Sequence, residues 1–298
     1  MYVETPIKLH HYYAKWHYLL DELKHKRRFF NAATKEFFGE LFGGVEILKY
    51  WDKEKSEFES VVLELPEATN LYRSRVCNSI EDLTNIFNDP LKHVGPPPKH
   101  LARGGRMNAE GVVVFYGAMD LDTCLAEMRP ALASDIAIIT LSTTKPLRLL
   151  DFTRLEQARG GGALSYFQLD FTTQVEKRKF VRRLHSLISQ PIIPSKESDY
   201  IITQTMVEYL AHVHPEPFDG ILFASAQRAG GVNIVLFPDS DVLIETSSDL
   251  FPLTYVEDSI KLLRTESIKY THVEIDVFVD KNGDAHTYGL YKEDPDDD

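Results

Sequence analysis

Cysteine is scarce in this sequence, and long apolar runs are missing from it. The two cysteines among 298 residues, Cys77 and Cys124, are too few for a disulfide framework and have no neighbours at the spacing of metal ligands. No stretch approaches the roughly 20 consecutive apolar residues that a membrane-spanning helix needs. The first residues show no basic segment followed by an apolar run, so we expect no secretory signal. These absences predict a water-soluble, cytoplasmic protein with reduced thiols and no membrane contact.

Positive charge is also in deficit, because 33 Lys and Arg residues face 45 Asp and Glu residues and the formal net charge is -12. Such a charge argues against direct binding of nucleic acid, although it is compatible with a small basic pocket. Residues 293–298 are almost entirely acidic, and we interpret them as a solvated tail. The histidines His10, His17 and His25 are better explained by ordinary packing and surface positions than by a metal, so no metal site is predicted.

The first part of the chain has the pattern of packed helices. Over residues 7–50, apolar side chains such as Trp16, Leu19 and Phe37 recur at three- and four-residue spacing between charged positions. Pro66 then precedes a change in the spacing of the apolar residues. We therefore expect a helical segment over residues 1–68, made of two or three helices that pack on one another or on the following domain.

Short strands separated by glycine and proline dominate from residue 71 onward. Strands are expected at residues 111–117, 135–142, 147–151, 221–224 and 233–237, and helices at residues 121–129, 175–189 and 199–213. This mixture predicts an α+β domain over residues 69–240. Residues 241–298 form a C-terminal extension in which alternating apolar residues over 271–279, followed by Asn282-Gly283 and residues 285–291, predict a β-hairpin with a type I′ turn.

One glycine-rich turn presents an arginine after the rigid prolines of residues 96–98. Its sequence is Gly104-Gly105-Arg106-Met107-Asn108. Glycines allow the backbone to approach a ligand closely, and the planar guanidinium suits phosphate or carboxylate. The turn is therefore a candidate anion site, and a solvated surface arginine is the alternative interpretation.

A carboxylate and a hydroxyl follow at positions suited to a cleft. On the helix expected at residues 121–129, Glu127 lies beside the apolar stripe and can face a cleft, or it can form an ion pair with Arg129 or Arg103. Ser225 ends an apolar strand. It lacks the Gly-x-Ser-x-Gly setting of a hydrolase nucleophile, so we interpret it as a hydrogen-bonding group.

Five motifs occur along the chain in one order that resembles the RES domain, a family named for an arginine, a glutamate and a serine. They are Tyr72-Arg73-x-Arg75, the glycine-rich turn ending at Asn108, the Val-Val-Val-Phe-Tyr stretch ending at Tyr116, Ala126-Glu127-Met128-Arg129, and the Asp-Gly-Ile stretch that continues to Ser225. The resemblance covers residues 71–238. The chain departs from it in its N-terminal helical segment, its C-terminal hairpin, and Met107, where many relatives have an aromatic residue.

This resemblance implies a fold similar to the NAD-binding core of ADP-ribosyltransferases and an activity that cleaves NAD at the nicotinamide-ribose bond. It implies that the catalytic residues are Glu127, Arg73, Arg106, Tyr116 and Ser225. The NAD-binding residues that it implies are Arg73, Arg75, Gly105, Arg106, Asn108, Tyr116 and Ser225. In these roles the arginines hold the phosphates and ribose, Tyr116 lies beside nicotinamide, and Glu127 stabilises positive charge on the ribose.

RES proteins typically act as toxins, and their partner is a small DNA-binding antitoxin. No cofactor is implied beyond NAD as substrate, with inorganic phosphate as a further co-substrate if the reaction is a phosphorolysis rather than a hydrolysis. A homodimer is compatible with the sequence. Two other functions stay open, a protein ADP-ribosyltransferase and a non-catalytic module that senses a nucleotide or binds a partner; a ribonuclease using Arg178 and His185 ranks below both.

Overall fold

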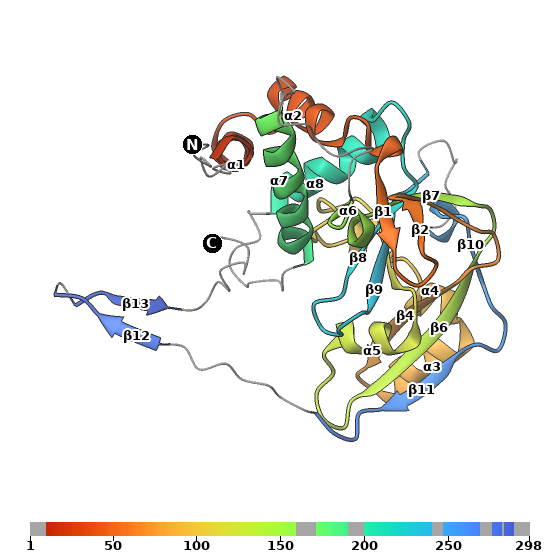
Figure 1. Ribbon diagram of the computed structural model, residues 1–298. Coiled ribbons are helices and arrows are strands. Elements are labelled where there is room, and N and C mark those ends of the chain that lie inside the picture. The colour runs from red at the N-terminus through yellow and green to blue at the C-terminus, as the bar shows by residue number, and fades with distance from the viewer. Residues whose placement is uncertain are drawn as a thin grey trace, which may run out of the picture.

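A nine-stranded mixed sheet forms the centre of the molecule, and helices cover it (Figure 1). The computed structural model describes residues 10–158, 171–189, 200–239, 247–268, 276–281 and 283–288. The strand order is β10-β6-β4-β5-β9-β8-β7-β3, with β11 also paired to β6. The strands of this sheet are β3 (Val62–Leu65), β4 (Asn70–Cys77), β5 (Phe115–Ala118), β6 (Asp135–Thr143), β7 (Leu147–Asp151), β8 (Gly220–Ala224), β9 (Val232–Leu236), β10 (Leu253–Tyr255) and β11 (Lys261–Arg264). The predicted α+β fold class is confirmed.

Helices lie in two groups around this sheet. In Figure 1, α1, α2, α7 and α8 gather toward the top of the view, whereas α3, α4 and α5 lie toward the bottom. The helices are α1 (His10–His25), α2 (Ala32–Phe42), α3 (Ile80–Asn88), α4 (Pro90–Val94), α5 (Leu121–Met128), α6 (Phe152–Leu155), α7 (Phe171–Ser189) and α8 (Ile201–Glu208), which continues as a π-helical turn (Tyr209–Val213); short 3-10 turns occupy Val45–Ile47, Lys99–Leu101 and Ser247–Leu250. The strands β7 and β8 are parallel neighbours, so the chain between them must cross over, and it does so through α6, α7 and α8.

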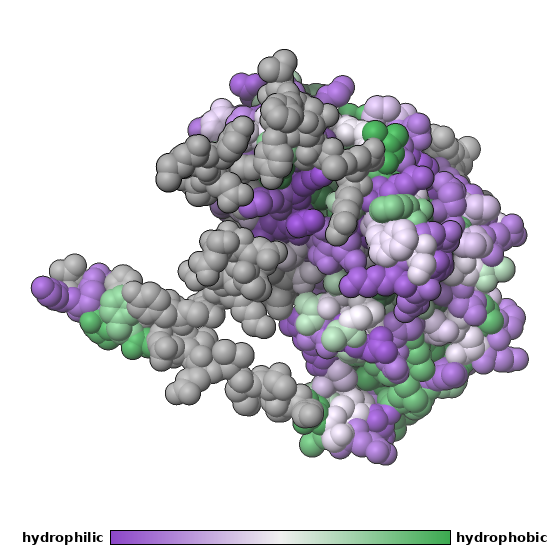
Figure 2. Space-filling view, in the orientation of Figure 1, coloured by the Kyte–Doolittle hydropathy of each residue, from purple (hydrophilic) through white to green (hydrophobic). Residues whose placement is uncertain are grey.

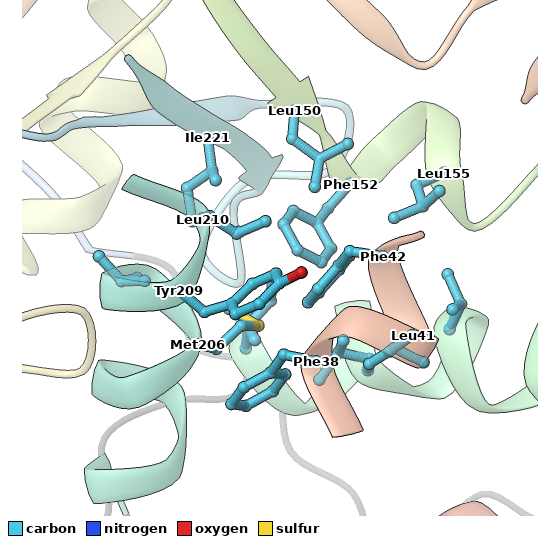
Figure 3. Packing of buried hydrophobic residues seen from close by; sticks show 14 of the residues in the cluster. Phe38, Leu41, Phe42, Leu150, Phe152, Leu155, Met206, Tyr209, Leu210 and Ile221 are labelled. Carbon is cyan, nitrogen blue, oxygen red and sulfur yellow. The ribbon is translucent and has the colours of Figure 1, made fainter. Parts of the chain in front are cut away.

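Both faces of the sheet are buried, which explains why its central strands are almost continuously apolar. Leu150 of β7, Ile221 of β8 and Val235 of β9 point into one core, and their chain neighbours Leu149, Leu222, Ile234 and Leu236 point into the other. The first core also takes in the N-terminal helices, and Phe38 and Phe42 of α2 pack beside Phe152 and Tyr209 (Figure 3).

The N-terminal helices pack on the sheet domain as predicted. The ring centroid of Trp16 lies 5.8 Å from that of Phe180 in α7, and Phe37 and Tyr12 surround the same ring. The sequence pattern missed three strands in this region. A hairpin of β1 (Lys49–Asp52) and β2 (Glu57–Ser60) follows the helices, and β3 joins the main sheet beside β7. The boundary expected near residue 68 stays a prediction, and β3 lies before it.

Further differences concern the length of one strand and several elements that the sequence pattern missed. The strand expected from residue 111 begins only at Phe115, because the buried Val113 and Val114 precede the ladder to β9. The helices α3, α4 and α6 and the strands β4, β10 and β11 were not expected. Most of these segments are short, and the apolar residues in them meet partners that are distant in sequence, as β11 does in pairing with β6.

The C-terminal hairpin is present as a separate two-stranded sheet of β12 (Asp276–Val279) and β13 (Ala285–Tyr288). The predicted type I′ turn is wrong. The N–H of Asp280 donates to the carbonyl of Asp284, which leaves three residues between them, and Gly283 has a φ of 89°. Hydrophobic residues gather on this hairpin, where Val277, Phe278 and Val279 are exposed (Figure 2). The expected strand residues 271–275 and 289–291, and the acidic tail, lie outside the described residues.

Among the described residues, no helix has the length and apolar character needed to cross a bilayer. The longest helix, α7, has 19 residues and carries lysines and arginines along its length. Its apolar residues instead form a stripe, with Phe180, Leu184 and Ile188 buried in the first core. That amphipathic pattern is typical of a helix that covers a sheet.

Candidate functional site

A cavity of about 590 Å³ opens between β4, β5, α5, β9 and the glycine-rich turn. Its volume falls within the roughly 300–1,000 Å³ of small-molecule sites. Six of the predicted site residues line it: Arg73, Gly105, Arg106, Asn108, Tyr116 and Glu127. Ser225 does not line the cavity but contacts Glu127, and Arg75 lies outside it, where its Nη1 donates to the carbonyl of His93 at 2.9 Å.

The carboxylate of Glu127 is held in place by two side-chain donors. Asp120 caps the start of α5 by accepting from the N–H of Thr123 at 2.9 Å, and Glu127 lies near the other end of this helix. Its Oε1 accepts from the hydroxyl of Ser225 at 2.6 Å and from Nδ2 of Asn233 at 2.8 Å. The alternative ion pairs with Arg103 or Arg129 do not form among the described residues. The carboxylate is therefore oriented by two neutral donors.

Ser225 is itself oriented by the turn that follows β8. Its Oγ accepts from the N–H groups of Gln227 and Arg228, both at 3.1 Å, and its hydroxyl donates to Glu127. Arg228 in turn pairs with Asp120 at 3.2 Å, which connects this turn to the beginning of α5. With these partners, the hydroxyl of Ser225 holds the carboxylate of Glu127 in position.

The glycine-rich turn is closed around Tyr116. The N–H of Gly105 donates to the carbonyl of Asn108 at 2.9 Å, and the phenol of Tyr116 donates to Oδ1 of Asn108 at 3.0 Å while accepting from the N–H of Met107 at 3.1 Å. A Cβ at Gly105 would come within 2.8 Å of Oδ1 of Asn108 and 3.1 Å of the phenol oxygen of Tyr116, so a larger residue would displace the side chains that close the turn. Burial raises the pKa of Tyr116 to about 12, and the phenol therefore remains a neutral donor at physiological pH.

The helix α8 holds the same turn from the other side. Nε2 of Gln204 donates to the carbonyls of Gly105 and Asn108 at 2.8 and 3.0 Å, and the hydroxyl of Thr203 donates to the carbonyl of Arg106 at 2.7 Å. Three backbone carbonyls of the turn are thus held by two side chains of one helix. The cavity wall formed by this turn is rigid for that reason.

The two arginines predicted to bind phosphate already donate hydrogen bonds to backbone carbonyls of the protein. Nε of Arg73 donates to the carbonyl of Val94 at 2.7 Å and its Nη1 donates to the carbonyl of Tyr116. Burial lowers the pKa of the Arg73 guanidinium to about 10, which still leaves it charged at neutral pH. Nη1 of Arg106 donates to the carbonyl of Ile188 in α7, and burial lowers the pKa of this guanidinium too.

The sequence pattern missed Asn233 as a site residue. Asn233 is a buried amide at the second position of β9, in the otherwise apolar stretch from Val232 to Leu236. A buried polar side chain in such a strand needs a partner, and that requirement was the available indication. Arg103 and Arg129 also line the cavity, although the sequence suggested only ion pairs with Glu127 for them.

The arrangement offers a fixed carboxylate, several guanidinium groups and a neutral phenol around one cavity. Among the described residues, no cluster of three or more His, Cys, Asp or Glu side chains could hold a metal ion. Cys124 lines the cavity as well, but burial raises the pKa of its thiol, and the thiol donates to the hydroxyl of Ser74 at 3.2 Å. The chemistry available here is therefore electrostatic stabilisation of a cation next to a bound anion.

Comparison with known proteins adds one finding. A model of the RES domain matches residues 71–255. No curated protein and no solved structure matches the chain. The matched range contains every residue that lines the cavity, and also Ser225. Because it covers more than half of the 298 residues, the chain belongs to the RES domain family.

Proposed function

We propose that this protein binds NAD in the cavity and cleaves the bond between nicotinamide and ribose, with water or inorganic phosphate as the acceptor. The observation that carries the proposal is the carboxylate of Glu127, which Ser225 and Asn233 hold at the wall of an arginine-lined cavity. Membership in the RES domain family supports NAD as the substrate. The ADP-ribosyltransferase-like character of the fold is part of the same proposal.

The reaction places a positive charge where Glu127 can stabilise it. When the bond between the anomeric carbon and the ring nitrogen breaks, its electron pair leaves with nicotinamide, which becomes neutral. The ribose is left with oxocarbenium character until an oxygen of water or phosphate bonds to the anomeric carbon and, in the case of water, gives up a proton. A carboxylate fixed beforehand stabilises this charge without reorganisation during the step.

The neighbouring residues contribute position. Ser225 and Asn233 hold Glu127 in one orientation, and the turn from Gly105 to Asn108 forms a rigid wall against which the dinucleotide packs. The ring of Tyr116 lines the cavity, so its face can contact the nicotinamide. Holding the substrate in one geometry lowers the entropic part of the barrier.

Product analysis with pure protein tests this function. NAD is incubated with and without inorganic phosphate, and the products are separated by chromatography and identified by mass. Nicotinamide with ADP-ribose indicates hydrolysis, and nicotinamide with a phosphorylated ADP-ribose indicates phosphorolysis. Labelling of added protein without release of free ADP-ribose would instead support a protein ADP-ribosyltransferase. Tight NAD binding without any product would support a non-catalytic module.

Glu127→Gln provides the matched control, because it keeps the shape of the side chain and removes its charge. Turnover is expected to fall by roughly 10²–10³-fold, about 3–4 kcal/mol in the barrier, while NAD binding survives. Melting temperature should change little, because Glu127 is exposed. Near-normal turnover of folded Glu127→Gln protein would contradict the assignment.

We further propose that the protein acts as a toxin that depletes NAD and that a small DNA-binding antitoxin restrains it. The RES family membership supports this role. Expression of the wild-type chain in a bacterial host should lower cellular NAD and arrest growth, and expression of Glu127→Gln should do neither. Equal growth arrest by both proteins would show that NAD cleavage is not the cause.

A further inference from the structure

Four arginines line the cavity, and they differ in what their guanidinium groups contact. Arg73 donates to the carbonyls of Val94 and Tyr116, and Arg106 donates to the carbonyl of Ile188. Arg103 and Arg129 are both exposed, and within the described residues neither side chain makes a hydrogen bond or an ion pair. Two of the four cations are thus committed to the fold, and two are available to a ligand.

The backbone of Arg129 has a conformation that arginine disfavours. It ends α5 with φ 43° and ψ 52°, in the left-handed region where helices usually place glycine. A residue with a Cβ is strained there relative to glycine. Among the described residues, the side chain forms no hydrogen bond or ion pair that would offset this strain. A strained residue at the edge of a ligand cavity points to a functional reason for its side chain.

We propose that Arg103 and Arg129 form the anion site of the cavity and bind the diphosphate of the dinucleotide, while Arg73 and Arg106 mainly hold the cavity wall. The identity of the dinucleotide rests on the proposed function. In NAD the diphosphate is attached to the 5′ carbon of the ribose that reacts at its anomeric carbon. Arg129 follows Glu127 by two residues, so one helix end brings the anion-binding and charge-stabilising groups together.

Charge supports the same division of roles. The protein carries a formal net charge of -12, so an anionic substrate is repelled by the surface as a whole. Exposed guanidinium groups at the cavity provide a local attraction and can form paired hydrogen bonds to phosphate oxygens. Arg73 and Arg106 have fewer donors left for that purpose.

Arg129→Gly separates binding from folding, because glycine adopts a positive φ without strain. We expect the melting temperature to stay the same or rise, KM for NAD to increase about 10- to 100-fold, and kcat to change little. Arg129→Lys should keep part of the affinity, since it retains charge but loses the planar fork. Arg103→Gln should raise KM in the same direction. Arg182→Gln, which removes an exposed arginine of α7 outside the cavity, serves as control and should leave KM unchanged.

Inorganic pyrophosphate provides a readout that does not depend on NAD cleavage. It should raise the melting temperature of the wild-type protein, and this rise should be lost in Arg129→Gly but kept in Glu127→Gln. Normal KM and normal pyrophosphate binding in Arg129→Gly would overturn the anion site even if NAD is cleaved. Pyrophosphate binding that depends on Arg129 in a protein unable to cleave NAD would support the anion site and refute the proposed reaction. No pyrophosphate binding by the wild-type protein would overturn the anion site.

Discussion

The polar side chains of the cavity divide into those that hold the protein together and those that face a ligand. The phenol of Tyr116 is bound within the glycine-rich turn, so its ring, and not its hydroxyl, remains for a substrate. The hydroxyl of Ser225 accepts two backbone N–H groups and donates a hydrogen bond to Glu127. We therefore expect the substrate contacts to be made by Glu127, by aromatic surface, and by Arg103 and Arg129, whose side chains form no hydrogen bond or ion pair among the described residues.

Substitution of Asn233 tests whether turnover depends on the orientation of Glu127. In Asn233→Leu the carboxylate loses the donor at 2.8 Å but keeps Ser225. Hydrogen bonds to charged groups contribute about 1.5–3 kcal/mol, so turnover should fall about 10- to 100-fold. Stability should fall by less than about 1 kcal/mol, because leucine suits the buried strand and water can solvate Glu127.

The measurements for Asn233→Leu are kcat for NAD and the free energy of unfolding in denaturant. Ser225→Ala, which removes the other donor to Glu127, provides the comparison and should lower kcat in the same way. A folded Asn233→Leu protein with wild-type kcat would show that the orientation of Glu127 does not limit the reaction.

At the scale of elements, α7 connects the N-terminal helices to the cavity. Phe180, near the middle of the helix, packs against Trp16 of α1, and the carbonyl of Ile188 receives Arg106. Between them His185 is buried, with Nδ1 2.5 Å from a carboxylate oxygen of Glu156 and Nε2 accepting from the N–H of Ala224 at 2.9 Å. Because Nε2 accepts a hydrogen bond, the ring proton is on Nδ1, which donates to Glu156. One helix thus fixes both Arg106 and the residue before Ser225.

His185→Leu should release the end of β8. The partly buried N–H of Ala224 would lose its acceptor, which costs about 1–3 kcal/mol in the free energy of unfolding. Turnover should fall as well, because Ser225 follows directly and would no longer hold Glu127 firmly. His185→Gln is the matched variant, since its Oε1 can accept from Ala224 in place of Nε2. Denaturant unfolding and NAD turnover measure both effects, and equal losses in the two variants would argue against a role for the acceptor.

At the scale of the whole molecule, the described cavity residues and their supports all precede the C-terminal hairpin. The strands β12 and β13 pair with each other and not with the nine-stranded sheet, and in Figure 1 they stand apart from it. By contrast, β11 covers the edge of β6 from Asp135 to Ile138. Removal of the hairpin alone and removal of the hairpin together with β11 should therefore affect stability differently.

Removal of residues 269–298 should leave NAD turnover unchanged and alter the free energy of unfolding by no more than about 0.5 kcal/mol, as for other changes away from the core. Removal of residues 257–298 should be more damaging, because it also deletes β11 and exposes the edge of β6. Thermal unfolding and NAD consumption of the two shortened chains decide the matter. A large loss of turnover in the chain that lacks only residues 269–298 would show that the hairpin takes part in catalysis.

The fold class, most of the central strands and the family could be predicted from the amino-acid sequence alone. The strands β6, β7, β8 and β9 and the helices α5 and α7 could be predicted because hydrophobic periodicity reports which side of an element is buried. The ordered motifs also identified six residues that line one cavity. Periodicity does not report what lies opposite a side chain, and motif order does not report which donors are already used.

The hydrogen-bond partners of the cavity residues depend on how the chain folds. Asn233 reaches Glu127 across 106 positions of sequence, and the carbonyls that take up Arg73 and Arg106 belong to α4, β5 and α7. Arg103 and Arg129 stand out only because the other two arginines are bound to the backbone. A hydrogen bond depends on the distance and direction between two groups, and for residues far apart in the chain both are set by how the helices and the sheet pack.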